Sequence, residues 1–213
     1  MPKIEGLPGD HDFKPERLLT LSRLFHTAGN WAESKRLLVW ALELQRERVG
    51  DRKVARILGA LSDISLAMRS LKEGIQQMKE TLETWERLGD KAQQAQRLIG
   101  LAWLLREDDQ VDAAEEAAFR TLDLLPEGEQ YRVCESHRLL GRIYQSKGET
   151  EKTFHHNEVA LGTVSSFDWH DALFSVHYNL TELCLDEDGS DDAHAHLEHA
   201  ELHTTDSTRR LGL

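Results

Sequence analysis

Proline is scarce in this chain, with 4 residues in 213, three of them before residue 16 and the fourth at Pro126. Proline interrupts helices because it lacks an amide hydrogen and its ring clashes with the preceding turn. Long helices are therefore allowed on both sides of Pro126. No stretch approaches the roughly 18 apolar residues of a membrane span, and the N-terminus lacks the apolar core of a secretory signal. We expect a soluble, cytoplasmic protein with no membrane partner.

Cysteine and catalytic motifs are equally sparse. The only two cysteines, Cys134 and Cys184, fall at inward-facing positions of separate helical stretches. This placement predicts buried free thiols in a reducing compartment rather than a disulfide. No G-x-x-x-x-G-K-[ST] phosphate loop and no Ser/His/Asp or Cys/His grouping is recognisable. We expect no enzymatic activity and no cofactor.

An excess of positive charge is also missing, since the formal net charge is −12. Nearly all of it lies at the C-terminal end, where residues 148–213 contain 14 acidic and 3 basic residues. Such a surface repels nucleic acid, and no basic stripe offsets it. The sequence therefore argues against DNA or RNA binding. The acidic end is either solvated surface or a site for a basic partner.

What the chain does contain is a pattern with a period of 39 or 40 residues. Leucine followed by a small residue recurs at Leu21, Leu61, Leu101, Leu140 and Leu180. Three small positions recur with it in five units: Ser22, Ser62, Ala102, Gly141 and Thr181; Ser34, Gly74, Ala114, Thr153 and Ala193; Ala41, Thr81, Thr121, Ala160 and Ala200. Small side chains let two helices approach closely, and a fixed period indicates stacked repeats.

The pattern predicts ten helices in five antiparallel pairs. The first helices of the pairs are expected at about 15–28, 51–68, 91–107, 131–147 and 168–186, and the second at about 31–46, 71–88, 111–124, 150–163 and 190–204. Gly50 and Gly89 suit helix C-caps, and Asp51 and Asp90 suit N-caps.

The helices divide the chain into segments. Residues 1–14 lack periodicity and are expected to be flexible, and residues 15–204 form the repeat array. The repeats are expected at about 15–50, 51–90, 91–128, 129–167 and 168–204. Residues 205–213 look like the start of a truncated further helix, which would leave the C-terminal repeat uncapped.

This arrangement resembles the tetratricopeptide repeat (TPR). The small positions, the large residues Phe25, Leu105 and Tyr144 that follow the first of them, and Pro126 at the end of the third unit all match that family's pattern. The resemblance covers about residues 15–204. It implies an all-α fold, a right-handed superhelical solenoid of about five helical hairpins.

The period is longer than the 34 residues usual in TPRs and is similar to that of kinesin-light-chain-type and cell-polarity adaptors. The stretches "KAQQAQRLIGLAWLL", "AAEEAAFRTLDLLPEGEQYRVCESHRLLGRIYQSKGE" and "HYNLTEL" also resemble the C-terminal TPR array of fungal NOD-like signalling ATPases. The ATPase module of such proteins is missing here. The resemblance implies a sensor or scaffold piece.

TPR solenoids bind partners in a concave groove lined by the first helix of each pair, so candidate site residues are sought there. Positions two residues before and after each repeated leucine, with neighbouring arginines, give the candidate set: Leu19, Arg23, Arg56, Asp63, Ile99, Trp103, Arg106, Arg138, Arg142, Tyr178 and Glu182. The charges are mixed, since Glu135 and Asp186 oppose the arginines. The Lys/Asn clamp of chaperone-type TPRs is not matched.

Two interpretations remain open for Trp103 and for the chain. Trp103 either anchors a partner or packs between neighbouring first helices. The chain is either a scaffold that binds a protein or peptide segment in the groove, or a regulatory and oligomerisation module of a larger signalling ATPase. A homo-oligomer would use the exposed C-terminal repeat.

Three short motifs suggest other chemistry. "DEDGSDD" at 186–192 departs from the EF-hand spacing, which favours a turn. His196, His199 and His203 share one helical face, but no ligand from a second helix is evident, so we expect no metal site. Asn179 begins a glycosylation sequon inside an expected helix, which argues against its use.

Overall fold

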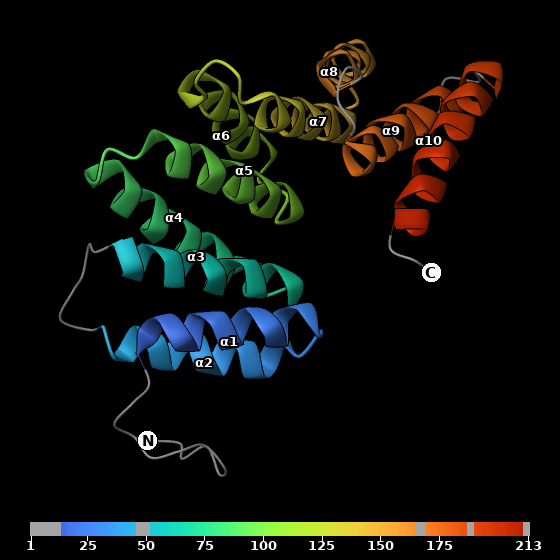
Figure 1. Cartoon of the computed structure of the whole chain (residues 1–213). Coiled ribbons are helices and arrows are strands. Elements are labelled where there is room, and N and C mark those ends of the chain that lie inside the picture. The colour runs from blue at the N-terminus through green and yellow to red at the C-terminus, as the bar shows by residue number, and fades with distance from the viewer. Residues whose placement is uncertain (1–13, 46–51, 165–168, 187–189, 211–213) are drawn as a thin grey trace. The chain divides into compact units, whose positions relative to one another are not determined.

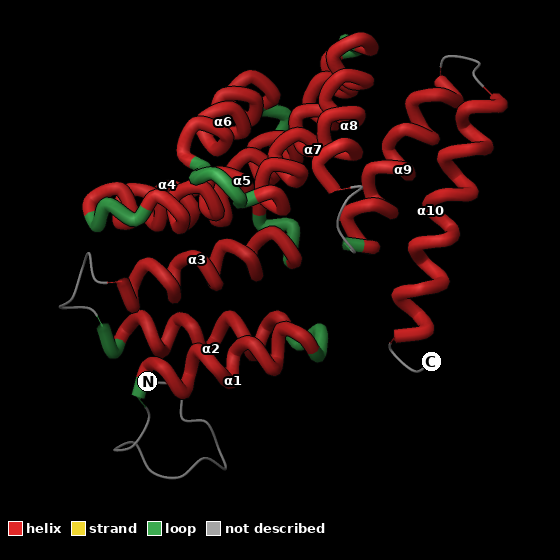
Figure 2. Tube along the Cα trace, turned by 45° about the horizontal axis from the view of Figure 1, so that its top comes forward, coloured by secondary structure: helices red, strands yellow, loops and turns green. Residues whose placement is uncertain are grey.

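The computed structural model describes residues 14–45, 52–164, 169–186 and 190–210, and in these ranges the chain consists of helices and loops (Figure 1, Figure 2). The helices are α1 Pro15–Thr27, α2 Trp31–Glu43, α3 Arg52–Ala67, α4 Leu71–Arg87, α5 Lys91–Glu107, α6 Val111–Leu124, α7 Gln130–Lys147, α8 Thr150–Val164, α9 His170–Asp186 and α10 Ser190–Arg210. Nine of the ten begin and end within three residues of the ranges predicted from the sequence. None of those described is long and apolar enough to cross a membrane.

The last helix differs from the prediction. α10 continues without interruption to Arg210, so residues 205–210 extend it and do not begin a separate helix. The prediction of a new helix start at residue 205 was wrong. Neither glycine nor proline occurs between Thr204 and Arg210, so nothing in the sequence terminates α10 there.

The chain divides into two compact units, residues 1–89 and 90–213. The first contains the hairpins α1–α2 and α3–α4, and α2 packs on α3. The second contains α5–α6, α7–α8 and α9–α10, with α6 packed on α7 and α8 packed on α9. The boundary coincides with a predicted repeat boundary. Of the expected flexible segment 1–14, only Lys14 lies within the described residues.

The two helices of each hairpin cross at the small positions. All fifteen small residues found in the sequence are buried. In the first repeat the Ser34 hydroxyl donates a hydrogen bond to the Ser22 carbonyl oxygen at 2.7 Å. In the second, the Ser62 hydroxyl donates to the Gly74 carbonyl oxygen at 3.0 Å. In both repeats a small side chain of one helix therefore touches the backbone of the other helix, which leaves no space for a larger residue at the crossing.

The turns within hairpins share one backbone conformation. Gly29, Arg69, Asp109 and Gly148 occupy equivalent places in the first four repeats, and all have φ between 56° and 74°. This left-handed region is easily reached by glycine and disfavoured for arginine. Between repeats two and three, Asp90 caps α5 by accepting a hydrogen bond from the Gln93 amide, as predicted.

Apolar clusters join neighbouring hairpins inside each unit. In the first unit Leu37, Leu38 and Ala41 of α2 pack with Ile57 and Leu61 of α3. This is the arrangement of stacked repeats, in which a hairpin buries its apolar face only against its neighbour.

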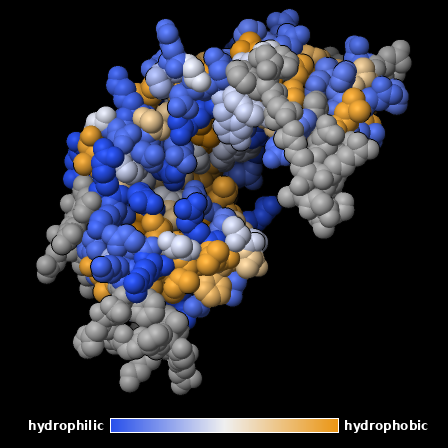
Figure 3. All heavy atoms as spheres, in the orientation of Figure 1, coloured by the Kyte–Doolittle hydropathy of each residue, from blue (hydrophilic) through white to orange (hydrophobic). Residues whose placement is uncertain are grey.

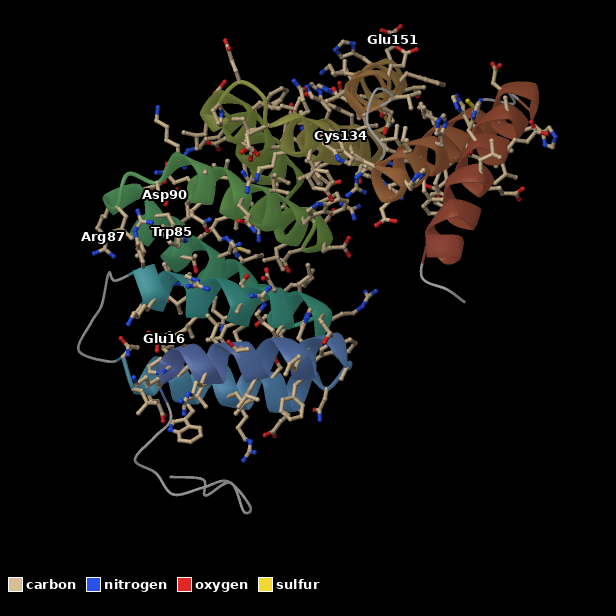
Figure 4. All side chains as sticks on the ribbon, in the orientation of Figure 1. Glu16, Trp85, Arg87, Asp90, Cys134 and Glu151 are labelled. Atoms are coloured by element: carbon tan, nitrogen blue, oxygen red, sulfur yellow. The ribbon has the colours of Figure 1, made fainter. Side chains whose placement is uncertain are left out.

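In the second unit the corresponding cluster includes Cys134 of α7 (labelled in Figure 4), with Ala160 of α8 and Val176 of α9. Cys134 and Cys184 are buried free thiols, as predicted. Burial raises the pKa of Cys134 to about 12, so its thiol stays protonated at neutral pH.

Gly141 offers a direct test of the close crossing. A Cβ atom at Gly141 would lie 2.7 Å from Nδ2 of Asn157 on α8, and that amide donates to the Thr153 carbonyl oxygen. We expect Gly141→Leu to lower the free energy of unfolding by about 1–3 kcal/mol. Gly141→Ala should also destabilise, despite the higher helix propensity of alanine. Chemical denaturation measures both effects.

Gly162 of α8 is the matched control, because a Cβ atom there meets nothing within 4 Å. We expect Gly162→Ala to leave stability unchanged or to raise it by up to about 1 kcal/mol. Equal effects of Gly141→Ala and Gly162→Ala would contradict the close crossing.

Candidate functional site

The first helices of the second unit form a row, because α7 contacts both α5 and α9. Seven of the candidate residues lie on this row, which we call the A-helix face: Ile99, Trp103, Arg106, Arg138, Arg142, Tyr178 and Glu182. The structure brings several of them into direct contact. Trp103 contacts Arg106 and Arg138, and Arg142 contacts Glu182, so these contacts link α5 to α7 and α7 to α9.

Trp103 of α5 is half-buried beneath two guanidinium groups. Arg106 lies 5.1 Å from its ring centroid, and Arg138 of α7 lies 5.0 Å away. Both distances fit cation–π interactions. The sequence allowed Trp103 either to anchor a partner or to pack between neighbouring first helices. The contact with Arg138 of α7 corresponds to the second interpretation. The ring still keeps some exposed surface that a partner can reach.

Arg138 and Arg142, two of the candidate groove residues, both pair with acidic residues of the chain itself. The Arg138 side chain is 17% exposed and its guanidinium donates two hydrogen bonds to the carboxylate of Glu135, at 3.2 and 2.9 Å. Arg142 is 28% exposed and pairs with Glu182 of α9 at 3.0 Å. Arg138 is thus paired with a glutamate of its own helix, and Arg142 with a glutamate of the next first helix.

The Arg142–Glu182 pair follows from the repeat period. The two residues are 40 positions apart and occupy the same place in successive repeats. Stacking places equivalent positions of neighbouring helices side by side, so opposite charges at one position pair across the repeat boundary.

Aromatic residues extend the A-helix face on α9. Tyr178 is 42% exposed and its ring stacks on Phe174, with centroids 6.1 Å apart. On α7, Tyr131 is half exposed and meets the ring of Trp169 edge-on. Exposed aromatic rings are favoured at protein interfaces because they bury much area with little loss of side-chain freedom.

The remaining candidates lie in the first unit and are not placed relative to the A-helix face. Leu19 packs against the apolar cluster of α1, α2 and α3. Arg23, Arg56 and Asp63 are exposed on α1 and α3. The side chain of Asp186 lies outside the described residues.

Two pairs of histidines, which the sequence reading missed, hold the last two hairpins together. The Nδ1 atoms of His137 on α7 and His156 on α8 lie 2.9 Å apart. Those of His177 on α9 and His196 on α10 lie 3.2 Å apart. In each pair one neutral ring can donate its N–H to the other. The signal was available, because both residues recur at an offset of 40.

His156 lies in an aromatic and polar cluster between α6, α7 and α8. Its ring stacks on Tyr144 with centroids 5.2 Å apart and meets Phe119 of α6 edge-on. Burial, together with His137 and His155, lowers the pKa of His156 to about 4. Glu115 opposes this shift, while Lys152 adds to it. His156 is therefore neutral at physiological pH.

Glu115 of α6 anchors the next layer of this cluster. It accepts hydrogen bonds from the Tyr144 hydroxyl and from the Lys147 ammonium group, which also reaches Asp112 at 2.7 Å. Burial by itself would raise the pKa of Glu115, but these hydrogen bonds lower it. The polar contacts join α7 to the hairpin that precedes it.

The motifs that suggested other chemistry are resolved in part. Among the described residues, no group of three or more His, Cys, Asp or Glu side chains could hold a metal ion. The side chain of His203 lies outside that set, as does part of the 186–192 stretch. Asn179 is 3% exposed and donates to Asn157, which leaves no room for a glycan.

Stacked helical hairpins that cross at small residues define the class of this molecule: the chain has the all-α TPR-like solenoid fold. No protein-family model and no curated protein sequence matches the chain. Solved structures, by contrast, match most of it.

BtubC (BKLC) from P. vanneervenii has a TM-score of 0.77 and 18% identity, covering 91% of this chain and 80% of that one. TPR-like repeats of a Podosopora anserina protein described as a kinesin light chain have a TM-score of 0.72 and 16% identity, covering 93% and 100%. MamA has a TM-score of 0.60 and 16% identity, covering 89% and 97%. At these identities the likeness establishes the fold.

The histidine pair of the fourth repeat predicts loss of stability in acid. The pKa of His156 is about 4 in the folded chain and about 6.5 in an unfolded one. Between these values the unfolded state binds more protons, so the free energy of unfolding falls as the pH drops from about 6.5 towards 4. We expect this pair to contribute a loss of roughly 1–3 kcal/mol, measurable by denaturation at pH 7 and pH 4.5.

A double substitution isolates the effect. The positions of His137 and His156 are filled in the first repeat by Leu18 and Leu37, which are buried together. His137→Leu combined with His156→Leu should therefore fold and reduce the acid-induced loss. The exposed His26 is the control, and His26→Gln should keep the wild-type pH dependence. An unchanged acid sensitivity in the double variant would exclude the pair as its source.

Proposed function

We propose that the chain is a scaffold that binds a segment of a partner protein across the A-helix face. The observation that carries this proposal is a surface of α5, α7 and α9 that exposes aromatic rings beside paired charges. Trp103 and Tyr178 supply the apolar contacts, and the ion pairs surround them. Aromatic anchors with a polar rim are the usual composition of a protein-binding surface.

The chemistry of the segment follows from the charges of the face. Arg106, Arg138 and Arg142 are matched by Glu107, Glu135 and Glu182. A face neutralised in this way offers little net attraction to a highly charged ligand. A segment with an apolar or aromatic side chain at its centre fits it better than an acidic tail.

Arg142 is the position where a carboxylate of the partner adds specificity. Both members of its ion pair with Glu182 are partly exposed, at 28% and 36%. A partner carboxylate can therefore replace Glu182 at modest cost, since partly exposed ion pairs contribute little to stability. Arg138 is less available, because Glu135 holds it with two hydrogen bonds and its guanidinium group packs on the ring of Trp103.

Selection of peptides on the immobilised chain, followed by calorimetry with the selected peptides, tests the proposal. We expect Trp103→Ala and Tyr178→Ala each to weaken binding by about tenfold or more. Arg142→Glu should weaken peptides that carry an acidic residue more than peptides that lack one, and the difference should shrink at high salt.

Val39 on α2 provides the control, because it is 41% exposed and lies in the other unit. Val39→Ala should bind the selected peptides as wild type does. Circular dichroism confirms that each variant remains helical. Wild-type affinity in folded Trp103→Ala and Tyr178→Ala variants would show that the A-helix face is not the site.

The second function suggested by the sequence is a module of a larger signalling ATPase. The similarity to the TPR arrays of fungal NOD-like proteins stays a prediction. It is compatible with the A-helix face, because the bound segment could belong to such an ATPase. Peptides from ATPase modules of that class belong in the selection for this reason.

A further inference from the structure

Equivalent positions of α5, α7 and α9 form rows that cross the A-helix face. The repeat offset of 39 or 40 residues gives two such rows: Ile99, Arg138 and Tyr178, and one helical turn further along, Trp103, Arg142 and Glu182. Arg142 pairs with Glu182 at 3.0 Å, within the second row. Arg138 lies 5.0 Å from the ring centroid of Trp103, which links the two rows. A segment that crosses the face along the rows therefore meets α5, α7 and α9 in turn.

The spacing of these helices matches one backbone conformation. α7 contacts both α5 and α9, and the axes of packed helices lie about 8–10 Å apart. The polyproline II helix has three residues per turn, so it presents a side chain on the same side about every 9 Å. Every third side chain of such a segment would lie over a successive helix of the face. A β-strand differs, because its residues three apart point to opposite sides.

The composition of the face does not suit an amphipathic helix, which needs a continuous hydrophobic groove. Ile99 and Trp103 on α5 and Tyr178 on α9 are separated by the paired arginines of α7. Figure 3 shows the same mixture on the visible side of the α9–α10 hairpin, where hydrophobic residues are scattered among hydrophilic ones. Separate contacts, one on each helix, suit the periodic side chains of a polyproline II segment.

The polar groups still available on this surface are hydrogen-bond donors. Tyr131 and Tyr178 are exposed, and their hydroxyls bond to no other residue in the described part of the chain, whereas the Tyr144 hydroxyl donates to a glutamate. Arg142 donates one N–H to Glu182, and a guanidinium group has five. A polyproline II segment has no internal hydrogen bonds, and its prolines lack amide hydrogens, so its carbonyl oxygens need donors.

We infer that the segment bound in the proposed function, on which this step rests, is uncharged, rich in proline and in the polyproline II conformation. One apolar side chain would contact Ile99 and the exposed part of Trp103. The side chain three residues further on would lie on the carbon chains of the two α7 arginines. The next in the series would pack on the ring of Tyr178, whose hydroxyl would donate to a backbone carbonyl.

The charges of the face agree with this occupant. Each arginine of α7 stays paired with a glutamate of the chain, so the segment needs no charge of its own. A polyproline II segment is also already ordered before it binds, which lowers the loss of conformational entropy. A flexible segment with the same apolar side chains should bind more weakly.

Calorimetry with a synthetic probe is the experiment. The probe carries leucine at every third position and proline at the positions between, with uncharged ends. We expect it to bind, and one glycine inserted between two leucines should raise the Kd about tenfold because the later side chains no longer lie over successive helices. Replacing the prolines by alanine should raise the Kd about threefold or more.

Variants of the chain locate the contacts. Trp103→Ala and Tyr178→Ala should each raise the Kd of the probe about tenfold. Tyr178→Phe keeps the ring and removes the hydroxyl, so it should raise the Kd about threefold. Val39→Ala, on an exposed residue of the other unit, is the control and should bind the probe as wild type does.

The outcomes separate this inference from the proposed function. If peptides selected on the chain bind through Trp103 and Tyr178 but the proline probe does not bind, the segment is not of this class, although the scaffold function stands. An unchanged Kd after the glycine insertion, or tighter binding of the alanine peptide, has the same meaning. If neither the probe nor the selected peptides depend on Trp103 and Tyr178 in folded variants, both proposals are wrong.

Discussion

The close crossing of two helices at small residues is the constraint on which the rest of this structure depends. Ser34 reaches the backbone at Ser22 with its hydroxyl, and Gly141 leaves no space between its Cα atom and Asn157. Because the two helices of a hairpin pack so closely, their relative orientation is fixed. Every hairpin then presents the same positions to its neighbour. The Arg142–Glu182 ion pair, the apolar clusters between hairpins and the histidine pairs follow the repeat spacing because the crossing fixes the phase.

That phase is why so much of the fold could be predicted from the sequence. The small residues and the glycine and aspartate caps locate ten helices without knowledge of their packing. The prediction of a break at residue 205 failed for a physical reason, since it relied on a resemblance to the start of a helix. The stretch from Thr204 to Arg210 contains no residue that ends one.

The candidate site was less predictable, because the period tells which residues share a surface and not how they pair. Arg142 and Glu182 were both identified, yet their contact depends on rotamers and on the spacing of α7 and α9. Arg138 was expected to be available to a ligand, but Glu135 on the same helix holds it. Selecting groove residues by their position in the repeat overestimates how many charged side chains are unpaired. Charged residues of neighbouring repeats can pair and neutralise one another, as Arg142 and Glu182 do.

The recurrence of the histidine pairs has a consequence for the origin of the array. A buried histidine whose Nδ1 faces an apolar side chain leaves a polar atom without a partner, so His137 alone or His156 alone would be unfavourable. Two substitutions would have to arise together in each hairpin. Copying a whole hairpin that already contains both residues produces His177 and His196 in one step, at the observed offset. The offset of 40 between the two pairs is what duplication of one hairpin produces, whereas leucines fill the same positions in the first repeat.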